Sequence, residues 1–389
     1  MMNADLASPD SKDRLLRDNI DGNDALTTPK IIQVSTKYGY VLVTQQGLQD
    51  RPAIVTYHDI AYNSTTQFHN FFSTPEMMPI TAHFTIYHIN APGQEDQGQS
   101  LPTASIYPTM DQLAETVNDV FDHLNIKAAV GFGVGLGANI LVRFGLKYPA
   151  KFYGLMLVNC ITRGVGWLEG YSLKWPTKDI PNQQWTESLI NYLMWYHLGS
   201  ETRSSQPDLV DSLRDHLEND INVKNAIKLL NTFLKRTAIP MSRSSDMNKK
   251  GNIIITLQCP VMNVTGISSP HKDDVIDTND RCDPATTSYV EFADCGGAPL
   301  EEQPAKLAES IRLFLQGLGY ISHLSIPRFS IANRLAEQAA DYKRRHGSFS
   351  KPPRRVSAHI DSGHYVEDEP TEYEEKIEVL VDSFNNPNV

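Results

Sequence analysis

The chain has 389 residues, of which 40% are hydrophobic and 21% charged, a composition too apolar for a wholly disordered protein. Its formal net charge of -11 argues against nucleic-acid binding by the main domain, because such a surface needs a basic footprint. The four cysteines lie far apart in the sequence, without a Cys-x-x-Cys pair, which argues against a disulfide scaffold or a zinc site and fits a reducing compartment.

Residues 1–30 are predicted to be a polar, flexible leader, since they carry acidic residues and lack the apolar core of a secretory signal. The most apolar stretch, residues 128–142, holds four glycines and is shorter than the roughly 20 residues that span a bilayer. We therefore expect a soluble, cytoplasmic protein without a transmembrane segment.

Strand-like and helix-like patterns alternate from residue 31 to about residue 162. Alternating apolar residues on both sides of a Lys-Tyr-Gly turn predict a β-hairpin over 31–47. Buried strands are predicted at 53–58, 84–90, 128–132 and 153–159, and helices at 109–124 and 136–149. This order predicts an α/β fold with a mostly parallel sheet flanked by helices.

The alternation stops at about residue 163 and returns at residue 260. Residues 163–252 are polar with helical pieces, so we predict a helical cap inserted at one end of the sheet. Further strands are predicted at 260–266 and 288–293, followed by a final helix within 305–319. The predicted domain therefore covers residues 31–320.

Residues 321–389 are predicted to be a largely disordered tail, first basic and then acidic. Residues 343–355 contain six Lys or Arg and no acidic residue, whereas residues 361–382 contain nine acidic residues. Patterns typical of basophilic kinase sites end at Ser348 and Ser357, and both are predicted to be phosphorylated. The basic cluster also predicts weak contact with anionic lipid.

A glycine-rich turn at residues 131–138 lies where an α/β hydrolase carries its nucleophile elbow, G-x-S-x-G. Aligning the outer glycines of this motif puts Gly133 at the nucleophile position, and glycine has no side chain that could attack. The acid, expected within G-x-x-D after a later strand, is replaced by Ser269. The histidine, expected within G-H-x4-E-x-P, is replaced by Gly297. We therefore predict a pseudo-hydrolase with three vacated triad positions and no catalytic residues.

Several segments, in this order and spacing, resemble the N-myc downstream-regulated (NDR) family from about residue 31 to residue 320. They are HDIAYNSTTQF, HINAPGQEDQ, YPTMDQLAE, GFGVGLGANILVRFGLKYP, CPVMNVTGISSPHKDD and GGAPLEEQPAKLAESIRLFLQGLGY. The resemblance implies an α/β-hydrolase fold without hydrolase activity, acting in signal transduction, differentiation, stress response or trafficking. It also implies a phosphorylated tail, although the tail here lacks the long Ser/Thr-rich repeats of the best-known members.

A dinucleotide site is one alternative. Gly133, Gly135 and Ala138 match G-x-G-x-x-A between a strand and a helix. However, this is not the first strand–helix unit, and the next strand ends in Asn159 instead of an acidic residue that would hold the ribose. A tight strand–helix turn explains the glycines without a ligand, so no cofactor and no metal is expected.

The other alternative is a hydrolase with a displaced active site around His58 and Asp59, with Asp111 or Cys160 as further candidates. An isolated histidine at a strand end is more often a hydrogen-bonded structural residue. Under a cap, the vacated pocket would leave a concave site near His58, Asp59 and Val134. Protein partners are expected, with a small molecule as a second class of ligand.

Overall fold

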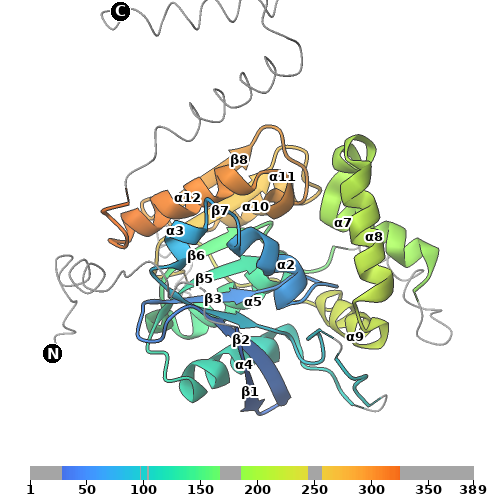
Figure 1. The fold of residues 1–389 in the computed structure, drawn as a ribbon, viewed down its shortest axis with the longest axis horizontal. Coiled ribbons are helices and arrows are strands. Elements are labelled where there is room, and N and C mark those ends of the chain that lie inside the picture. Colours follow the sequence, from blue (N-terminus) through green and yellow to red (C-terminus); the bar gives the residue numbers. More distant parts are fainter. Residues whose placement is uncertain (1–28, 97, 103–104, 167–184, 244–255, 325–389) are drawn as a thin grey trace, which may run out of the picture. The chain divides into compact units, whose positions relative to one another are not determined.

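The computed structural model describes residues 29–96, 98–102, 105–166, 185–243 and 256–324. Within these ranges eight strands form one sheet in the order β1-β2-β4-β3-β5-β6-β7-β8 (Figure 1). They are β1 (Lys30–Thr36), β2 (Gly39–Gln46), β3 (Ala53–Tyr57), β4 (Thr85–Ile89), β5 (Ala129–Val134), β6 (Phe152–Val158), β7 (Val261–Gly266) and β8 (Thr287–Phe292). The β1–β2 and β2–β4 pairs are antiparallel and all other neighbours in the sheet are parallel, which confirms the predicted fold class.

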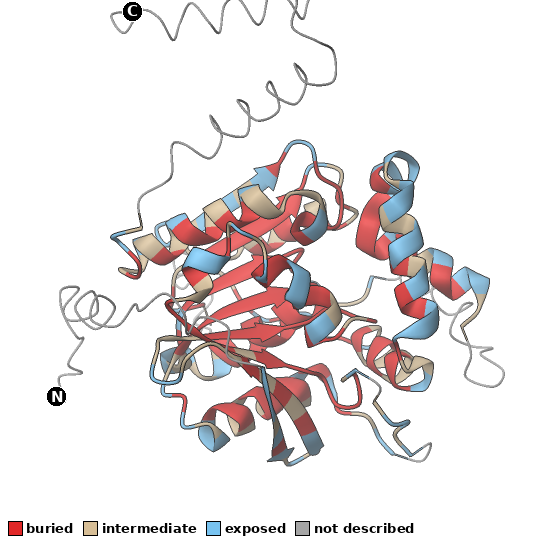
Figure 2. Ribbon diagram, in the orientation of Figure 1, coloured by how far each residue is buried: buried red, intermediate tan, exposed pale blue. Residues whose placement is uncertain are grey.

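Helices cover both faces of the sheet, and Figure 2 shows the buried residues concentrated on the strands between them. One face packs against α4 (Met110–His123) and α5 (Leu136–Lys147), and the other against α2 (Ser64–Phe72), α3 (Met78–Thr81) and α12 (Pro304–Gly317). Two short helices, η1 (Pro149–Lys151) and α11 (Pro299–Glu302), and the helix α10 (Lys272–Asp280) complete this part of the chain.

The strands alternate between two apolar clusters, as a strand buried on both faces requires. In β6, Leu155 and Leu157 join the cluster under α4 and α5, whereas Met156 and Val158 join the cluster under α2 and α12. This double burial explains why the sequence shows nearly continuous apolar runs here.

Local signals set where elements begin. The side chain of Thr109 accepts a hydrogen bond from the Gln112 amide at 3.3 Å, and the Gln112 side chain accepts one from the Thr109 amide at 2.9 Å. This capping box starts α4 at the position that the sequence predicts. Strands β3 and β4 end one residue before the predicted ends, and α2, α3 and α10 had no prediction.

Between β6 and β7 the chain forms α7 (Glu187–Ser205), α8 (Pro207–Asn219) and α9 (Val223–Phe233), which lie together beside the sheet in Figure 1. Apolar side chains of these helices, such as Leu193, Leu213 and Leu229, belong to the same cluster as those of α4 and α5. This helical insertion therefore packs onto the main core.

Among the described residues, every helix is too short or too polar to cross a membrane. Most of the predicted leader and the predicted tail, including Ser348 and Ser357, lie outside the described residues.

Candidate functional site

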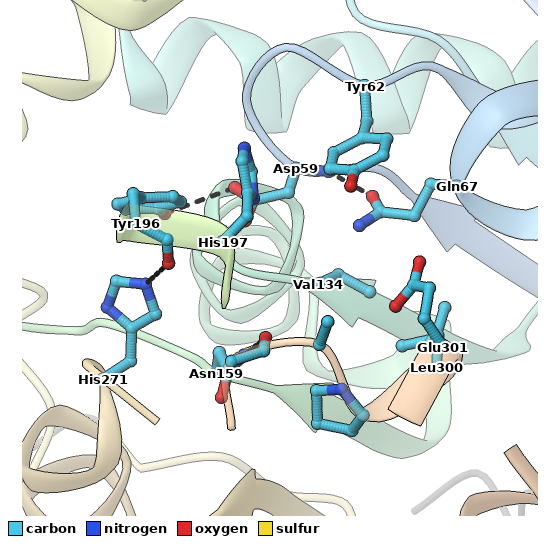
Figure 3. A pocket seen from close by; sticks show the side chains of 13 residues that line it. Asp59, Tyr62, Gln67, Val134, Asn159, Tyr196, His197, His271, Leu300 and Glu301 are labelled. Carbon is cyan, nitrogen blue, oxygen red and sulfur yellow. Dashed lines mark hydrogen bonds and ion pairs between the residues drawn. The ribbon is translucent and has the colours of Figure 1, made fainter. Parts of the chain in front are cut away.

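The site lies where β3, β5 and β6 end, under helix α7 (Figure 3). A small cavity lies there. The centre of a water molecule can occupy about 10 Å³ of it, which is room for about one water molecule. Its lining residues are Asp59, Tyr62, Gln67, Val134, Asn159, Tyr196, His197, His271, Gly297, Ala298, Pro299, Leu300 and Glu301.

The sharp turn between β5 and α5 is at Gly135. Its backbone has φ 50° and ψ -112°, a conformation that favours glycine, and it directly precedes the first residue of α5. The sequence placed the nucleophile position at Gly133, but Gly133 lies within β5, where a Cβ would press on the backbone of Ala138. The residue on a strand-to-helix turn is the one that an elbow exposes, so the relevant glycine is two positions later than predicted.

Asp59 occupies the space in front of this turn. Its Oδ1 accepts hydrogen bonds from the backbone amides of Leu136 at 2.8 Å and Ile60 at 2.7 Å. In an α/β hydrolase these are the two oxyanion-hole donors, one from the residue after the nucleophile and one from the loop between a strand and the next helix. A side chain added at Gly135 would overlap the carboxylate of Asp59. The chain's own carboxylate thus fills the place of a reacting oxyanion.

Burial dominates the electrostatics of Asp59, which is 3% exposed. Removal from water raises the pKa of its carboxyl to about 7, and the amides of Leu136 and Ile60 and the Tyr196 hydroxyl, 3.3 Å from Oδ1, oppose that rise. No lysine or arginine lines the cavity within the described residues, so the carboxylate is held by neutral donors.

Helix α7 supplies two side chains that cover Asp59, as Figure 3 shows. The Nδ1 of His197 lies 3.7 Å from Oδ2 of Asp59, and its buried Nε2 has no hydrogen-bond partner among the described residues. Burial lowers the pKa of His197 to about 3, with the nearby His271 and His216 adding to the shift. His271 in turn contacts the carbonyl oxygen of Tyr196 through Nε2 at 2.8 Å. Both histidines are therefore neutral at pH 7.

The segment where the sequence expects a catalytic histidine packs against α7. The amide of Gly297 donates to the carbonyl of Leu198 at 3.1 Å, and a Cβ on Gly297 would overlap the carbonyl of His197. A Cβ on the neighbouring Gly296 would likewise overlap the side-chain hydroxyl of Thr202. The helix backbone therefore fills the space that a histidine side chain needs.

Asn159 links the other two positions that the sequence predicts to be vacated, Ser269 and Gly297. It follows β6 with φ 50°, its Nδ2 donates to the carbonyl of Gly297 at 2.8 Å, and its Oδ1 accepts from Ser269 at 3.2 Å and from Thr265 at 3.0 Å. Ser269 is thus part of a buried hydrogen-bond network and carries no negative charge that could orient a base.

The structure separates the remaining predicted candidates. His58 is buried but faces backbone, since Nε2 accepts from the Ala91 amide at 2.9 Å and Nδ1 lies 2.7 Å from the carbonyl of Asp59. Asp111 of α4 pairs with Arg143 of α5 at 2.7 Å, and burial raises the pKa of the Cys160 thiol well above its ordinary value. Of the predicted pocket residues, Asp59 and Val134 line the cavity.

Sequence reasoning missed the contributions of Tyr196, His197 and His271. They lie more than a hundred residues from Asp59 and carry no motif, so only the packing of α7 and of the segment before α10 brings them to the site. Within the described residues, no group of three or more His, Cys, Asp or Glu side chains could hold a metal ion.

Comparisons with known proteins agree on family and fold. A sequence model described as the Ndr family matches residues 31–322. Protein NDRG3 of Xenopus tropicalis is 38% identical over 304 residues, which cover 76% of this chain and 75% of that protein. Protein NDRG1-A of Xenopus laevis is 36% identical over 319 residues, covering 81% of this chain and 78% of that protein. A thermophilic esterase from Thermogutta terrifontis superposes with a TM-score of 0.58 at 15% identity, covering 75% of this chain and 99% of the esterase. The last likeness shows the fold alone.

Proposed function

The chain belongs to the Ndr family, as the resemblance in its sequence predicted, and from this premise we propose that it is a non-enzymatic signalling or adaptor protein on an α/β-hydrolase fold. The observation that carries the proposal is the position of the Asp59 carboxylate on both amides that an acyl-transfer enzyme would offer to a developing oxyanion. A substrate carbonyl would have to displace a buried group that already satisfies these donors.

The vacated positions in this proposal are Gly135, in place of Gly133, together with Ser269 and Gly297. A glycine provides no nucleophile, and neither a serine hydroxyl nor a second glycine supplies the acid and base that activate one. The cytoplasm is the proposed location and other proteins are the proposed partners. Ser348 and Ser357 are the proposed phosphorylation sites, which phosphopeptide mapping of the protein from stimulated cells would test.

The rival function is hydrolysis at a displaced site around His58 and Asp59. Both ring nitrogens of His58 contact backbone groups, which leaves His197 as the histidine beside Asp59. A cavity of about 10 Å³ is too small to admit an ester, so we expect no turnover from this pair.

The test is hydrolysis of p-nitrophenyl acetate and butyrate by the purified full chain, together with labelling by a fluorophosphonate probe. We expect rates equal to those of heat-denatured protein, no labelling, and the same result for His197→Ala and His58→Ala. Turnover above this background that His197→Ala abolishes, with the fold intact by circular dichroism, would establish a rebuilt active site and overturn the proposal.

A further inference from the structure

A larger groove lies beside the cavity at Asp59, between α2, α8 and α11. It has about 490 Å³ open to the centre of a water-sized sphere, the size of a site for a few side chains. Its lining residues are Tyr62, Thr66, Gln67, Asn70, Phe71, Thr74, Leu209, Ser212, Leu213, Asp215, His216, Asp220, Leu300, Glu301 and Pro304. Four of these also line the cavity at Asp59, namely Tyr62, Gln67, Leu300 and Glu301.

The groove combines an apolar floor with an acidic rim. Phe71, Leu213 and Leu300 lie in the floor and are no more than 4% exposed. Asp215 and Asp220, on the rim, are exposed, and Glu301 also lines the groove, where removal from water raises the pKa of its carboxyl to about 8. Neither lysine nor arginine is among the groove's lining residues in the part of the chain that the structure describes.

The cation nearest in sequence to this rim is committed elsewhere. Arg214 is the one lysine or arginine of α8, and its guanidinium lies 3.3 Å from carboxylate oxygens of both Glu187 and Glu218. The carboxylate of Asp215 accepts a hydrogen bond from the side-chain Nδ2 of Asn219 at 2.7 Å, a neutral contact that leaves its charge uncompensated. The rim therefore presents negative charge to whatever enters the groove.

We infer that this groove binds an arginine- or lysine-bearing segment of a partner protein. Such side chains combine an apolar stem with a cationic head, which matches an apolar floor below the exposed carboxylates of the rim. Charge complementarity of this kind gives partner choice and fast association. The inference rests on the proposed adaptor function, to which it adds a surface and a class of partner.

The experiment is fluorescence anisotropy of the full chain with a fluorescein-labelled nonapeptide that carries four arginines and two leucines. A second peptide, in which glutamate replaces each arginine, is the ligand control. We expect the arginine peptide to bind and the glutamate peptide not to bind, with the affinity falling as salt is added. In Asp215→Asn/Asp220→Asn the affinity should fall about tenfold, since two rim charges are removed without a change of shape.

The matched protein control is Asp208→Asn/Asp211→Asn, which removes two exposed charges from the same helix, outside the groove lining. It should change the affinity less than twofold. Equal losses in the two double variants would mean that only the overall charge acts, and would overturn the inference. No binding of the arginine peptide, or equal binding of the glutamate peptide, would also overturn it. These outcomes concern peptide binding alone. The proposed function is tested separately, by the ester hydrolysis assay described above.

Discussion

The single carboxylate of Asp59 stabilises both the loop after β3 and the start of α5. The amide hydrogen bonds from Leu136 and Ile60 satisfy two donors that would otherwise be buried without a partner. The opposing cost is the removal of a charge from water, which raises the pKa of the carboxyl to about 7. The hydrogen bonds that the Asp59 carboxyl accepts therefore stabilise the fold, whereas its buried negative charge destabilises it.

This balance predicts the effect of Asp59→Asn, which keeps the Oδ1 acceptor and removes the charge. Because the folded-state pKa lies above the unfolded value of 3.8, the native carboxyl contributes stability at low pH that is lost as the pH rises through 7. We expect the variant to exceed the wild type in free energy of unfolding at pH 8, by on the order of 1–4 kcal/mol, with the gap narrowing toward pH 5.

Urea denaturation of both proteins at several pH values measures this difference, with the exposed Asp208→Asn as control. Parallel stability curves for Asp59→Asn and the wild type between pH 5 and pH 8 would contradict the account of Asp59.

For single residues, the sequence located the elbow motif but assigned its nucleophile position to Gly133, whereas the turn lies at Gly135. Four glycines at alternate positions from Gly131 to Gly137 allow the elbow pattern to be aligned in two registers. Only the backbone angles of Gly135 distinguish them, and a glycine-rich stretch carries no local signal that fixes where the strand ends. The role of Asp59 could be suggested from its loop, but its contact with α5 is non-local.

Among the elements, helix α7 covers the cavity that contains Asp59. Its backbone carbonyls from His197 and Leu198 lie against Gly297, and the hydroxyl of Thr202 donates to Glu302 of α11 at 2.8 Å. These contacts bind the helix to the loop before α12. Small residues at Gly296 and Gly297 are what permit the close approach.

Restoring a histidine at this position should therefore damage packing. We expect Gly297→His to lower the free energy of unfolding by about 1–3 kcal/mol, because the side chain must displace α7 or the loop. Gly317→Ala is the control, since a Cβ there meets no atom within 4 Å. Thermal unfolding followed by circular dichroism measures both, and an unchanged Tm in Gly297→His would mean that α7 moves freely from the site.

Sequence patterns predicted the strands and helices of the sheet layer well because their apolar periodicity is local. The capping box of Thr109 and Gln112 marked the start of α4, for example. The same patterns gave no indication that Tyr196 and His197 would lie over Asp59, because helix packing is set by contacts between distant segments. The capping box of Asn63 and Thr66 is a local signal that can predict the start of the short α2, although the sequence prediction did not include this helix.

For the whole molecule, buried histidines make the fold sensitive to acid. Burial lowers the pKa of His58 and His271 to about 4 and that of His88 and His197 to about 3. These groups bind protons more readily in the unfolded chain, so the stability they preserve above pH 6.5 is lost as the pH falls toward their folded-state values. Asp59 and Glu301, whose carboxyl pKa values burial raises to about 7 and about 8, act in the opposite direction, but they are two groups against four.

We therefore expect the free energy of unfolding to decrease between pH 7 and pH 5, by up to about 1.4 kcal/mol per pH unit for each proton taken up on unfolding. Urea denaturation across this range measures the slope. His88→Gln should reduce it by about one proton, whereas the exposed His123→Gln serves as the control. A stability that is constant or rises on acidification would contradict this reading of the core.

The contact between Asp59 and the turn at Gly135 also bears on how such a protein changes over evolutionary time. A serine restored at Gly135 would meet the carboxylate, and a loop freed of Asp59 would still lack a nucleophile. Either step alone loses packing or hydrogen bonds and brings no activity. A hydrolase-type nucleophile at this turn would therefore require at least two linked substitutions, one to place a serine at Gly135 and one to remove the Asp59 carboxylate, and neither substitution is useful without the other.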